Sequence, residues 1–166
     1  MCMIMPNRQV VALLGLLAAM MALGGAWVAE TQAGLVPCAL CLIERWPFRI
    51  LLAVSALALA WPGVRRLALA AGAVTMLAGA GLGVLHVGVE QHWWPSPLPE
   101  CSAPALGGGT MAQRLARMPA RPAKPCDEPV LLIPGLPISF AGLQLAVALA
   151  LAAMLATSAL RTENRI

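Results

Sequence analysis

Long apolar runs separated by short polar segments constrain this chain more than any other feature. The runs cover about residues 10–28, 40–61, 67–89 and 139–160, and they consist mainly of Leu, Ala, Val and Gly. A helix that crosses the hydrocarbon core of a bilayer needs about 20 apolar residues. The runs therefore predict an all-α membrane protein, a bundle of four transmembrane helices that forms a single domain.

The composition supports a lipid environment. Hydrophobic residues make up 60% of the 166 residues and charged residues 11%, against about 45–50% and about 25% in soluble domains. A chain this short cannot hide such an excess in one small core, because much of its surface stays exposed. A soluble helical protein with long core helices is the alternative, and it fits this composition poorly.

Two of the runs carry additional signals. The third contains Gly79-Ala80-Gly81-Leu82-Gly83, and small residues at such spacing let helix backbones approach closely. We expect a packing seam there.

The first run could instead be a secretory signal with Thr31-Gln32-Ala33 as its cleavage site. Its apolar stretch is longer than the roughly 7–15 residues usual for such a signal, so we predict a retained helix.

The arginines predict the orientation. Cytoplasmic segments of membrane proteins collect Lys and Arg, and short loops weigh most. The turn between the second and third runs and both tails are basic, with Arg8, Arg65, Arg66, Arg161 and Arg165. Both termini are therefore predicted to be cytoplasmic. Segments 29–37 and 90–138 are then expected on the outer side, the second as one long periplasmic loop if the membrane is bacterial.

The long outer loop is rich in proline and glycine, so we expect it to be mostly irregular. One piece, Met111–Met118, predicts a short amphipathic helix with Met111, Leu115 and Met118 on one face. The loop also holds the basic residues Arg114, Arg117, Arg121 and Lys124. Nucleic-acid-binding surfaces often have aromatic residues between the basic ones, and none lies between these basic residues. The net charge of +4 therefore gives no reason to expect nucleic acid as a partner.

Four of the 5 cysteines fall on the predicted outer side. Cys38 and Cys41 open the second run, Cys101 and Cys126 lie in the long loop, and Cys2 lies in the cytoplasmic tail. The outer side of a bacterial inner membrane is oxidising. Four cysteines allow three pairings, among which the sequence alone does not choose.

Three kinds of chemistry are possible for these cysteines. Cys38-x-x-Cys41 is half of a zinc site, but Cys101 and Cys126 lack zinc-finger spacing, so no metal is expected. Structural disulfides suit Cys101 and Cys126, because closing a long loop stabilises a fold. A disulfide between Cys38 and Cys41 would close almost no loop. Short Cys-x-x-Cys pairs are the usual form of an exchanging dithiol, which is the interpretation favoured here.

Arg45 follows Cys41 by four residues, which places it one turn deeper on the same helical face. We expect this helix to begin near Cys38 and to bend at Pro47, with its positive N-terminal end favouring a thiolate at Cys41. An arginine inside a membrane costs about 2.5–3.5 kcal/mol at the centre and less near the interface. Arg45 is therefore expected to hold a thiolate and an anionic or carbonyl-bearing ligand. The alternative is an interfacial arginine that reaches lipid headgroups, and Glu44 could simply pair with an arginine.

At these residues the sequence resembles the DsbB family, bacterial inner-membrane proteins that reoxidise the periplasmic thiol oxidase DsbA and pass the electrons to quinone. The apolar runs match, and so do Pro37-Cys38-x-x-Cys41-x-x-Glu44-Arg45, Trp94-Pro95-Ser96-Pro97, Cys101, Cys126 and Gly135–Pro137. The most specific part is Cys-x-x-Cys-x-x-x-Arg combined with a second cysteine pair in the last outer loop.

The resemblance implies a thiol:quinone oxidoreductase of the bacterial inner membrane, with a periplasmic DsbA-like partner. It implies that Cys101 and Cys126 form the disulfide that oxidises DsbA. The sulfur of Cys101 is then the atom that DsbA attacks to form the mixed disulfide. The electrons then pass to Cys38 and Cys41, with Cys38 exchanging with Cys126. We expect the loop to move so that Cys126 reaches Cys38.

The resemblance also implies the quinone site. Cys41 meets the ring of ubiquinone or menaquinone, Arg45 steadies the quinone and the thiolate, and His86 and Glu44 are weaker candidates for the pocket. The sequence has no soluble-cofactor motif, which agrees with a lipid-dissolved acceptor. Two alternatives stay open: a vitamin K epoxide reductase-like protein, whose quinone-side cysteine pair lies in a late span, and a non-catalytic scaffold with structural disulfides.

Overall fold

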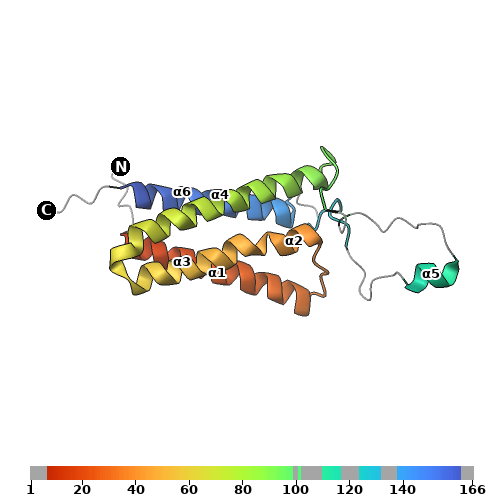
Figure 1. Cartoon of the computed structure of the whole chain (residues 1–166), viewed down its shortest axis with the longest axis horizontal. Helices are drawn as coiled ribbons and strands as arrows, with labels where there is room; N and C mark the ends of the chain where they lie inside the picture. Colours follow the sequence, from red (N-terminus) through yellow and green to blue (C-terminus); the bar gives the residue numbers. More distant parts are fainter. Residues whose placement is uncertain (1–6, 99–100, 102–109, 117–123, 132–137, 162–166) are drawn as a thin grey trace.

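The computed structural model describes residues 7–98, 101, 110–116, 124–131 and 138–161, with the side chains of 114–116 excepted. The helices in this part of the chain are α1 (Arg8–Thr31), α2 (Ala39–Ile43), α3 (Arg45–Ala60), the 3-10 turn η1 (Pro62–Val64), α4 (Arg65–Glu90), α5 (Met111–Ala116) and α6 (Phe140–Leu160). The long helices lie side by side, with the start of α1 and the end of α6 at the same end of the bundle (Figure 1).

Three of the described helices are long and apolar enough to cross a membrane: α1, α4 with its preceding turn, and α6. The predicted run 40–61 is divided between α2, of 5 residues, and α3, of 16. At about 1.5 Å per residue, α3 alone extends about 24 Å, short of a hydrocarbon core of about 30 Å. The structure therefore contains three such helices, and the second predicted span is an interrupted segment, so the count of four spans stays a prediction.

The interruption falls at Glu44, three residues before the bend expected at Pro47. Proline lacks an N–H group, and its ring crowds the carbonyl four positions earlier, which here belongs to Ile43. The helix α2 ends at that residue, and Glu44 keeps helical dihedral angles, with φ −61° and ψ −15°. The helix is therefore interrupted at Glu44, while the backbone keeps helical dihedral angles between α2 and α3.

The expected glycine seam of α4 contacts two different helices. A Cβ on Gly79 would lie 3.0 Å from the Cβ of Pro47 in α3, and one on Gly83 would lie 3.0 Å from the Cβ of Leu145 in α6. Gly81 faces open space, with nothing within 4 Å of such an atom. Each close approach needs a residue without a side chain, so α4 packs tightly against both neighbours.

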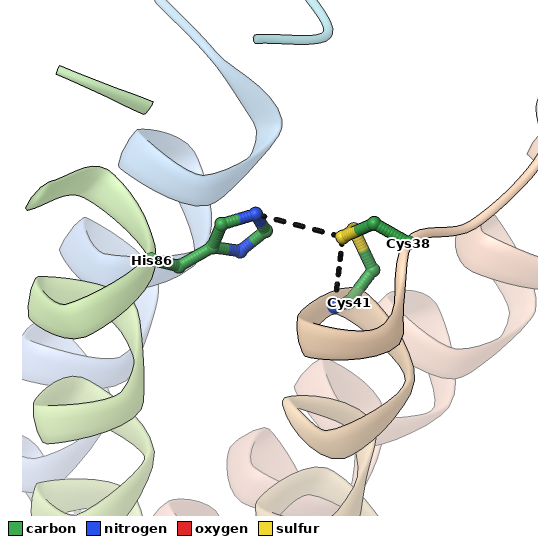
Figure 2. Close-up of side chains that lie close together, drawn as sticks. All are labelled: Cys38, Cys41 and His86. Atoms are coloured by element: carbon green, nitrogen blue, oxygen red, sulfur yellow. Dashed lines mark hydrogen bonds between the residues drawn. A yellow bond between two sulfur atoms is a disulfide. The ribbon is translucent and has the colours of Figure 1, made fainter. Parts of the chain in front are cut away.

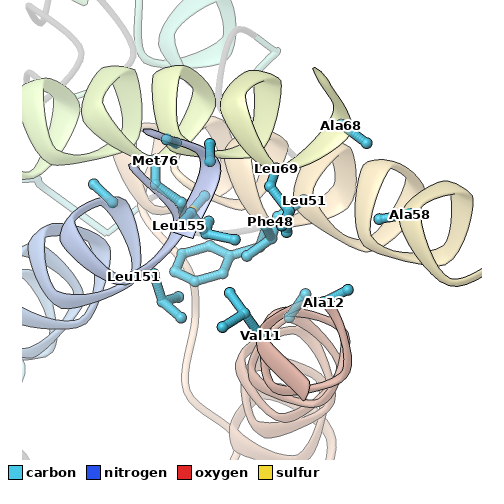
Figure 3. Packing of buried hydrophobic residues seen from close by; sticks show 14 residues of the cluster. Val11, Ala12, Phe48, Leu51, Ala58, Ala68, Leu69, Met76, Leu151 and Leu155 are labelled. Carbon is cyan, nitrogen blue, oxygen red and sulfur yellow. The ribbon is translucent and has the colours of Figure 1, made fainter. Parts of the chain in front are cut away.

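A cluster of buried apolar side chains joins the long helices and is built from many alanines and a few larger residues. Figure 3 shows Phe48 and Leu51 of α3 among Met76 of α4 and Leu155 of α6. Large apolar side chains also cover the outside of the bundle, where Met21 is 77% exposed. Exposed apolar surface on this scale marks contact with another apolar medium, in agreement with the predicted bilayer.

Arginines cap the helices at the end where α1 begins, which we call the arginine end. The Nε–H of Arg65 donates to the carbonyl of Ala58 at 2.9 Å, and the Nε–H of Arg66 donates to that of Ala159 at 3.0 Å. Arg8 likewise donates to the last turn of α6. The final carbonyls of a helix lack intrahelical partners, and basic side chains satisfy them there. The opposite end, with Cys38, is called the cysteine end.

The short helix predicted at Met111–Met118 is present as α5, and Met111 is exposed. Figure 1 shows α5 beyond the cysteine end. Other sequence features lie outside the described residues: Cys2, Met118, Gly135–Pro137 and Arg165.

Candidate functional site

Cys38 and Cys41 form a disulfide at the start of α2, with their Cα atoms 5.1 Å apart. Cys38 is the N-cap residue, and its sulfur accepts the backbone N–H of Cys41 at 3.1 Å. First-turn amides have no partner within the helix, so an N-cap acceptor stabilises the helix start. The helix amide is thus directed at the sulfur of Cys38, whereas the sequence had suggested Cys41 as the residue favoured by the helix end.

His86 of α4 lies between this disulfide and a carboxylate. Its Nε2 is 3.6 Å from the Sγ of Cys38, and its Nδ1 is 3.1 Å from the Oε1 of Glu44. Figure 2 shows the imidazole ring extending from α4 toward the sulfurs. His86 and Glu44 are both buried, and the two facing atoms have no other hydrogen-bond partner among the described residues. The site therefore contains a carboxylate, an imidazole and a sulfur in series, a set of groups that can hold and move a proton.

Arg45, the predicted ligand-holding cation, forms an ion pair with Glu30 near the end of α1. The two side chains are 19% and 30% exposed, so the pair lies partly out of solvent. Sequence reasoning missed Glu30, which comes from a different helix. The pair holds the guanidinium in the wall of a cavity that Cys41 also lines.

Cys101 and Cys126 form the second disulfide, with Cα atoms 4.9 Å apart. They are 4% and 1% exposed, and they belong to one buried cluster with Cys38, Leu40 and Val89. The two disulfides are therefore in the same buried cluster, and the expected movement of the loop stays a prediction.

Trp94 anchors the chain that leads to Cys101. Its indole Nε1–H donates to the carbonyl of Leu85 at 3.1 Å, and its ring lies over Gly88, where a Cβ would come within 1.9 Å of the ring. The absence of a side chain at Gly88 is what allows this contact. The Trp94-Pro95-Ser96-Pro97 segment thus folds back onto α4 and directs the loop toward the first disulfide.

A cavity of about 510 Å³ opens beside Cys41, between α1, α3 and α6. Cys38, Cys41, Glu44, Arg45 and His86 line one part of it, and most other lining residues are apolar: Ala18, Met21, Ala22, Phe48, Phe140 and Val147. Small-molecule sites commonly combine apolar walls with a few polar groups. Gln144 of α6 also lines the cavity, and its amide nitrogen is buried without a partner among the described residues. It was missed by the sequence interpretation.

Glu90, at the last turn of α4, is a second buried acid that the sequence interpretation passed over. It is 6% exposed and accepts a hydrogen bond of 2.6 Å from the hydroxyl of Ser139. Ser139 is the N-cap of α6 and accepts the N–H of Gly142 at 3.1 Å. Ionisable residues within membrane-spanning helices are rare, and Glu90 belongs to the last turn of α4, so extending the predicted span by one residue would have found it.

The arrangement defines a class of protein: a helical membrane protein with two disulfides in one buried cluster, one of which borders an apolar cavity. The family model of disulfide bond formation protein DsbB matches residues 8–157, most of the chain. The chain therefore belongs to the DsbB family and is a disulfide-forming membrane protein. Comparisons with curated proteins and with solved structures find no match.

Proposed function

We propose that this protein oxidises a periplasmic DsbA-type thiol oxidase by disulfide exchange and passes the electrons to a membrane quinone. The observation that carries the proposal is the packing of both disulfides in one buried cluster next to the cavity. Structural disulfides in a scaffold would have no reason to adjoin one another in this way.

The exchange steps balance within the chain's own cysteines. A thiolate of the reduced partner attacks the Sγ of Cys101, and Cys126 leaves as a thiolate. The partner's second thiolate then releases the oxidised partner and leaves a dithiol at Cys101 and Cys126. Attack by Cys126 on Cys38 frees Cys41, and attack by Cys101 on Cys126 restores the loop disulfide. Two electrons and two protons are now held by Cys38 and Cys41.

The cavity residues fit a quinone such as ubiquinone or menaquinone. Its apolar walls suit a ring with an isoprenoid tail, and Arg45 and the unpartnered amide of Gln144 suit carbonyl oxygens. A bound quinone would accept two electrons and two protons and leave as quinol. Cys41, less buried than Cys38, lies in the cavity wall, and its sulfur would be the more accessible of the two to a quinone bound there.

His86 is the group that moves a proton at the Sγ of Cys38. Its Nε2 is 3.6 Å from that sulfur, and Glu44, 3.1 Å from the other ring nitrogen, holds the ring in place. A positioned imidazole takes up the thiol proton when the dithiol ionises. Arg45, held by Glu30, supplies positive charge to the cavity that Cys41 lines.

We place the protein in a bacterial inner membrane with both termini in the cytoplasm. The arginine end would face the cytoplasm and the cysteine end the periplasm, following the bias of basic residues toward the inside. Maleimide labelling of single-cysteine variants in intact cells tests this. An added cysteine at Val64 should stay unlabelled by an impermeant reagent, and one at Asp127 should be labelled.

The direct test uses the purified full-length chain, a reduced DsbA-type protein and a short-chain ubiquinone or menaquinone. We expect quinone reduction coupled to partner oxidation, and a loss of at least about 1,000-fold in Cys41→Ser, because removing an essential nucleophile leaves only residual activity. The matched control, Cys2→Ser, should keep full turnover. Turnover that survives in Cys41→Ser would refute the proposed route.

A further inference from the structure

The reduced form of the site has the ligands of a metal centre. The only group of three potential ligands found among the described residues is Cys38, Cys41 and His86, whose ligand atoms all lie within 4.8 Å of one another. We propose that the dithiol form of Cys38 and Cys41, together with Nε2 of His86, binds a borderline divalent ion of the zinc type. This site differs from the four-cysteine arrangement considered from the sequence, because its third ligand is a histidine from another helix.

The distances suit tetrahedral coordination. With a Zn–S bond of about 2.3 Å and a Zn–N bond of about 2.0–2.1 Å, sulfur and nitrogen ligands lie roughly 3.6 Å apart. The Sγ of Cys38 and the Nε2 of His86 are separated by 3.6 Å in the structure. Two cysteines separated by two residues are a common half-site for zinc. The separation of Cys38 from His86 thus needs no adjustment, and only the two sulfurs must part when their bond is broken.

The charges also balance. Two thiolates and one neutral imidazole cancel the charge of Zn²⁺, and a neutral set is favoured where burial penalises net charge. Binding releases the two thiol protons. Arg45, which lines the same cavity, is already paired with Glu30, and the buried acid Glu90 is hydrogen-bonded to Ser139.

Glu44 supplies the supporting contact that a metal-bound histidine usually has. Such a histidine donates its second ring N–H to a carboxylate or carbonyl, which orients the ring. The Nδ1 of His86 lies 3.1 Å from the Oε1 of Glu44, and neither atom has another partner among the described residues. Coordination through Nε2 fixes the proton on Nδ1 and lets this contact become a hydrogen bond.

The proposal makes metal binding depend on the redox state. The disulfide carries no thiolate and has no strong affinity for zinc, whereas the dithiol does. Zinc bound to the dithiol holds both sulfurs and prevents the disulfide from re-forming. Periplasmic zinc is therefore expected to arrest the protein in its reduced form.

The test uses full-length protein in detergent with Cys2, Cys101 and Cys126 changed to serine, so that Cys38 and Cys41 are the only cysteines. Zinc affinity is measured against a chromophoric chelator after reduction with a phosphine and removal of the reductant. We expect about one Zn²⁺ per reduced chain and at least 100-fold weaker binding by the oxidised chain. Equal binding by both forms would overturn the proposal.

Variants at the two histidines separate this site from adventitious binding. His86→Ala should weaken zinc binding by at least tenfold and Glu44→Gln by about tenfold, the range for supporting contacts. His92→Ala, at the exposed second histidine, is the matched control and should change nothing. An unchanged affinity in His86→Ala would contradict the assignment.

A spectroscopic measurement on the reduced chain with His86 intact tests the site even if His86→Ala does not fold. Co²⁺ bound to the reduced chain should give the intense visible bands of tetrahedral cobalt and a sulfur-to-cobalt charge-transfer band. Weak bands of octahedral cobalt would overturn the proposal. No quinone or partner protein takes part, so this outcome is independent of the proposed function.

Discussion

At the arginine end, Arg65 and Arg66 donate to the last carbonyls of α3 and α6 from a surface position. At the cysteine end, Glu44 and His86 are buried, each about 3% exposed, beside a disulfide. Surface arginines that cap helices need no further explanation, since they satisfy groups that every helix leaves unpaired. Buried ionisable groups are costly, and their clustering at one site marks function. The arginine end of the bundle therefore contributes to the stability of the helices, and the cysteine end is the candidate functional site.

Among changes that leave the cysteines in place, the largest effect is expected from removing the imidazole of His86, the proposed proton-moving group at the cysteine end. His86→Ala should lower turnover with partner and quinone by about 100-fold or more, the range for removal of a general acid–base. His92→Ala should stay within about twofold of the unsubstituted protein. Steady-state quinone reduction measures both. If turnover in His86→Ala fell by only a few-fold, the imidazole would contribute packing and not proton transfer.

A second change loosens the anchor of the loop without touching the cysteines. Gly88→Ala places a methyl group where the Trp94 ring lies, and overpacking of this kind costs about 1–3 kcal/mol. We expect Trp94 to leave α4 and the Cys101–Cys126 disulfide to be reduced faster by dithiothreitol. Gly81→Ala, which meets nothing within 4 Å, is the matched control in the same helix. Equal reduction rates in the two variants would show that Trp94 does not protect the disulfide.

The smallest effect concerns the amide in the cavity. Gln144→Leu removes a hydrogen-bond donor worth about 1 kcal/mol, so the KM for quinone should rise about fivefold with little change in kcat. Thr157→Val lies on the same helix toward the arginine end, where its hydroxyl bonds only to carbonyls of its own helix. That variant should leave KM unchanged. A rise in both variants would point to a general loosening of α6.

The helices and the first cysteine pair could be predicted because their signals are local. Apolar runs gave the long helices, and the proline at position 47 gave an interruption, although its effect falls at Glu44, since the ring acts on the carbonyl of Ile43. The relation of His86 to Cys38 was not predictable, because it depends on the rotation of α4 against α2. Glu30 and Gln144 were missed for the same reason: each reaches the site from a separate helix.

The burial of Cys126 and Cys38 has a consequence for the selectivity of thiol exchange. A small thiol in the surrounding medium cannot collide with Cys126, which is 1% exposed, or with Cys38, which is 3% exposed. In the proposed reaction, a partner protein would have to uncover Cys101 before electrons could enter through the loop disulfide. Burial of that disulfide would thus slow its reaction with unrelated thiols, whereas Cys41 is partly buried and lines the cavity.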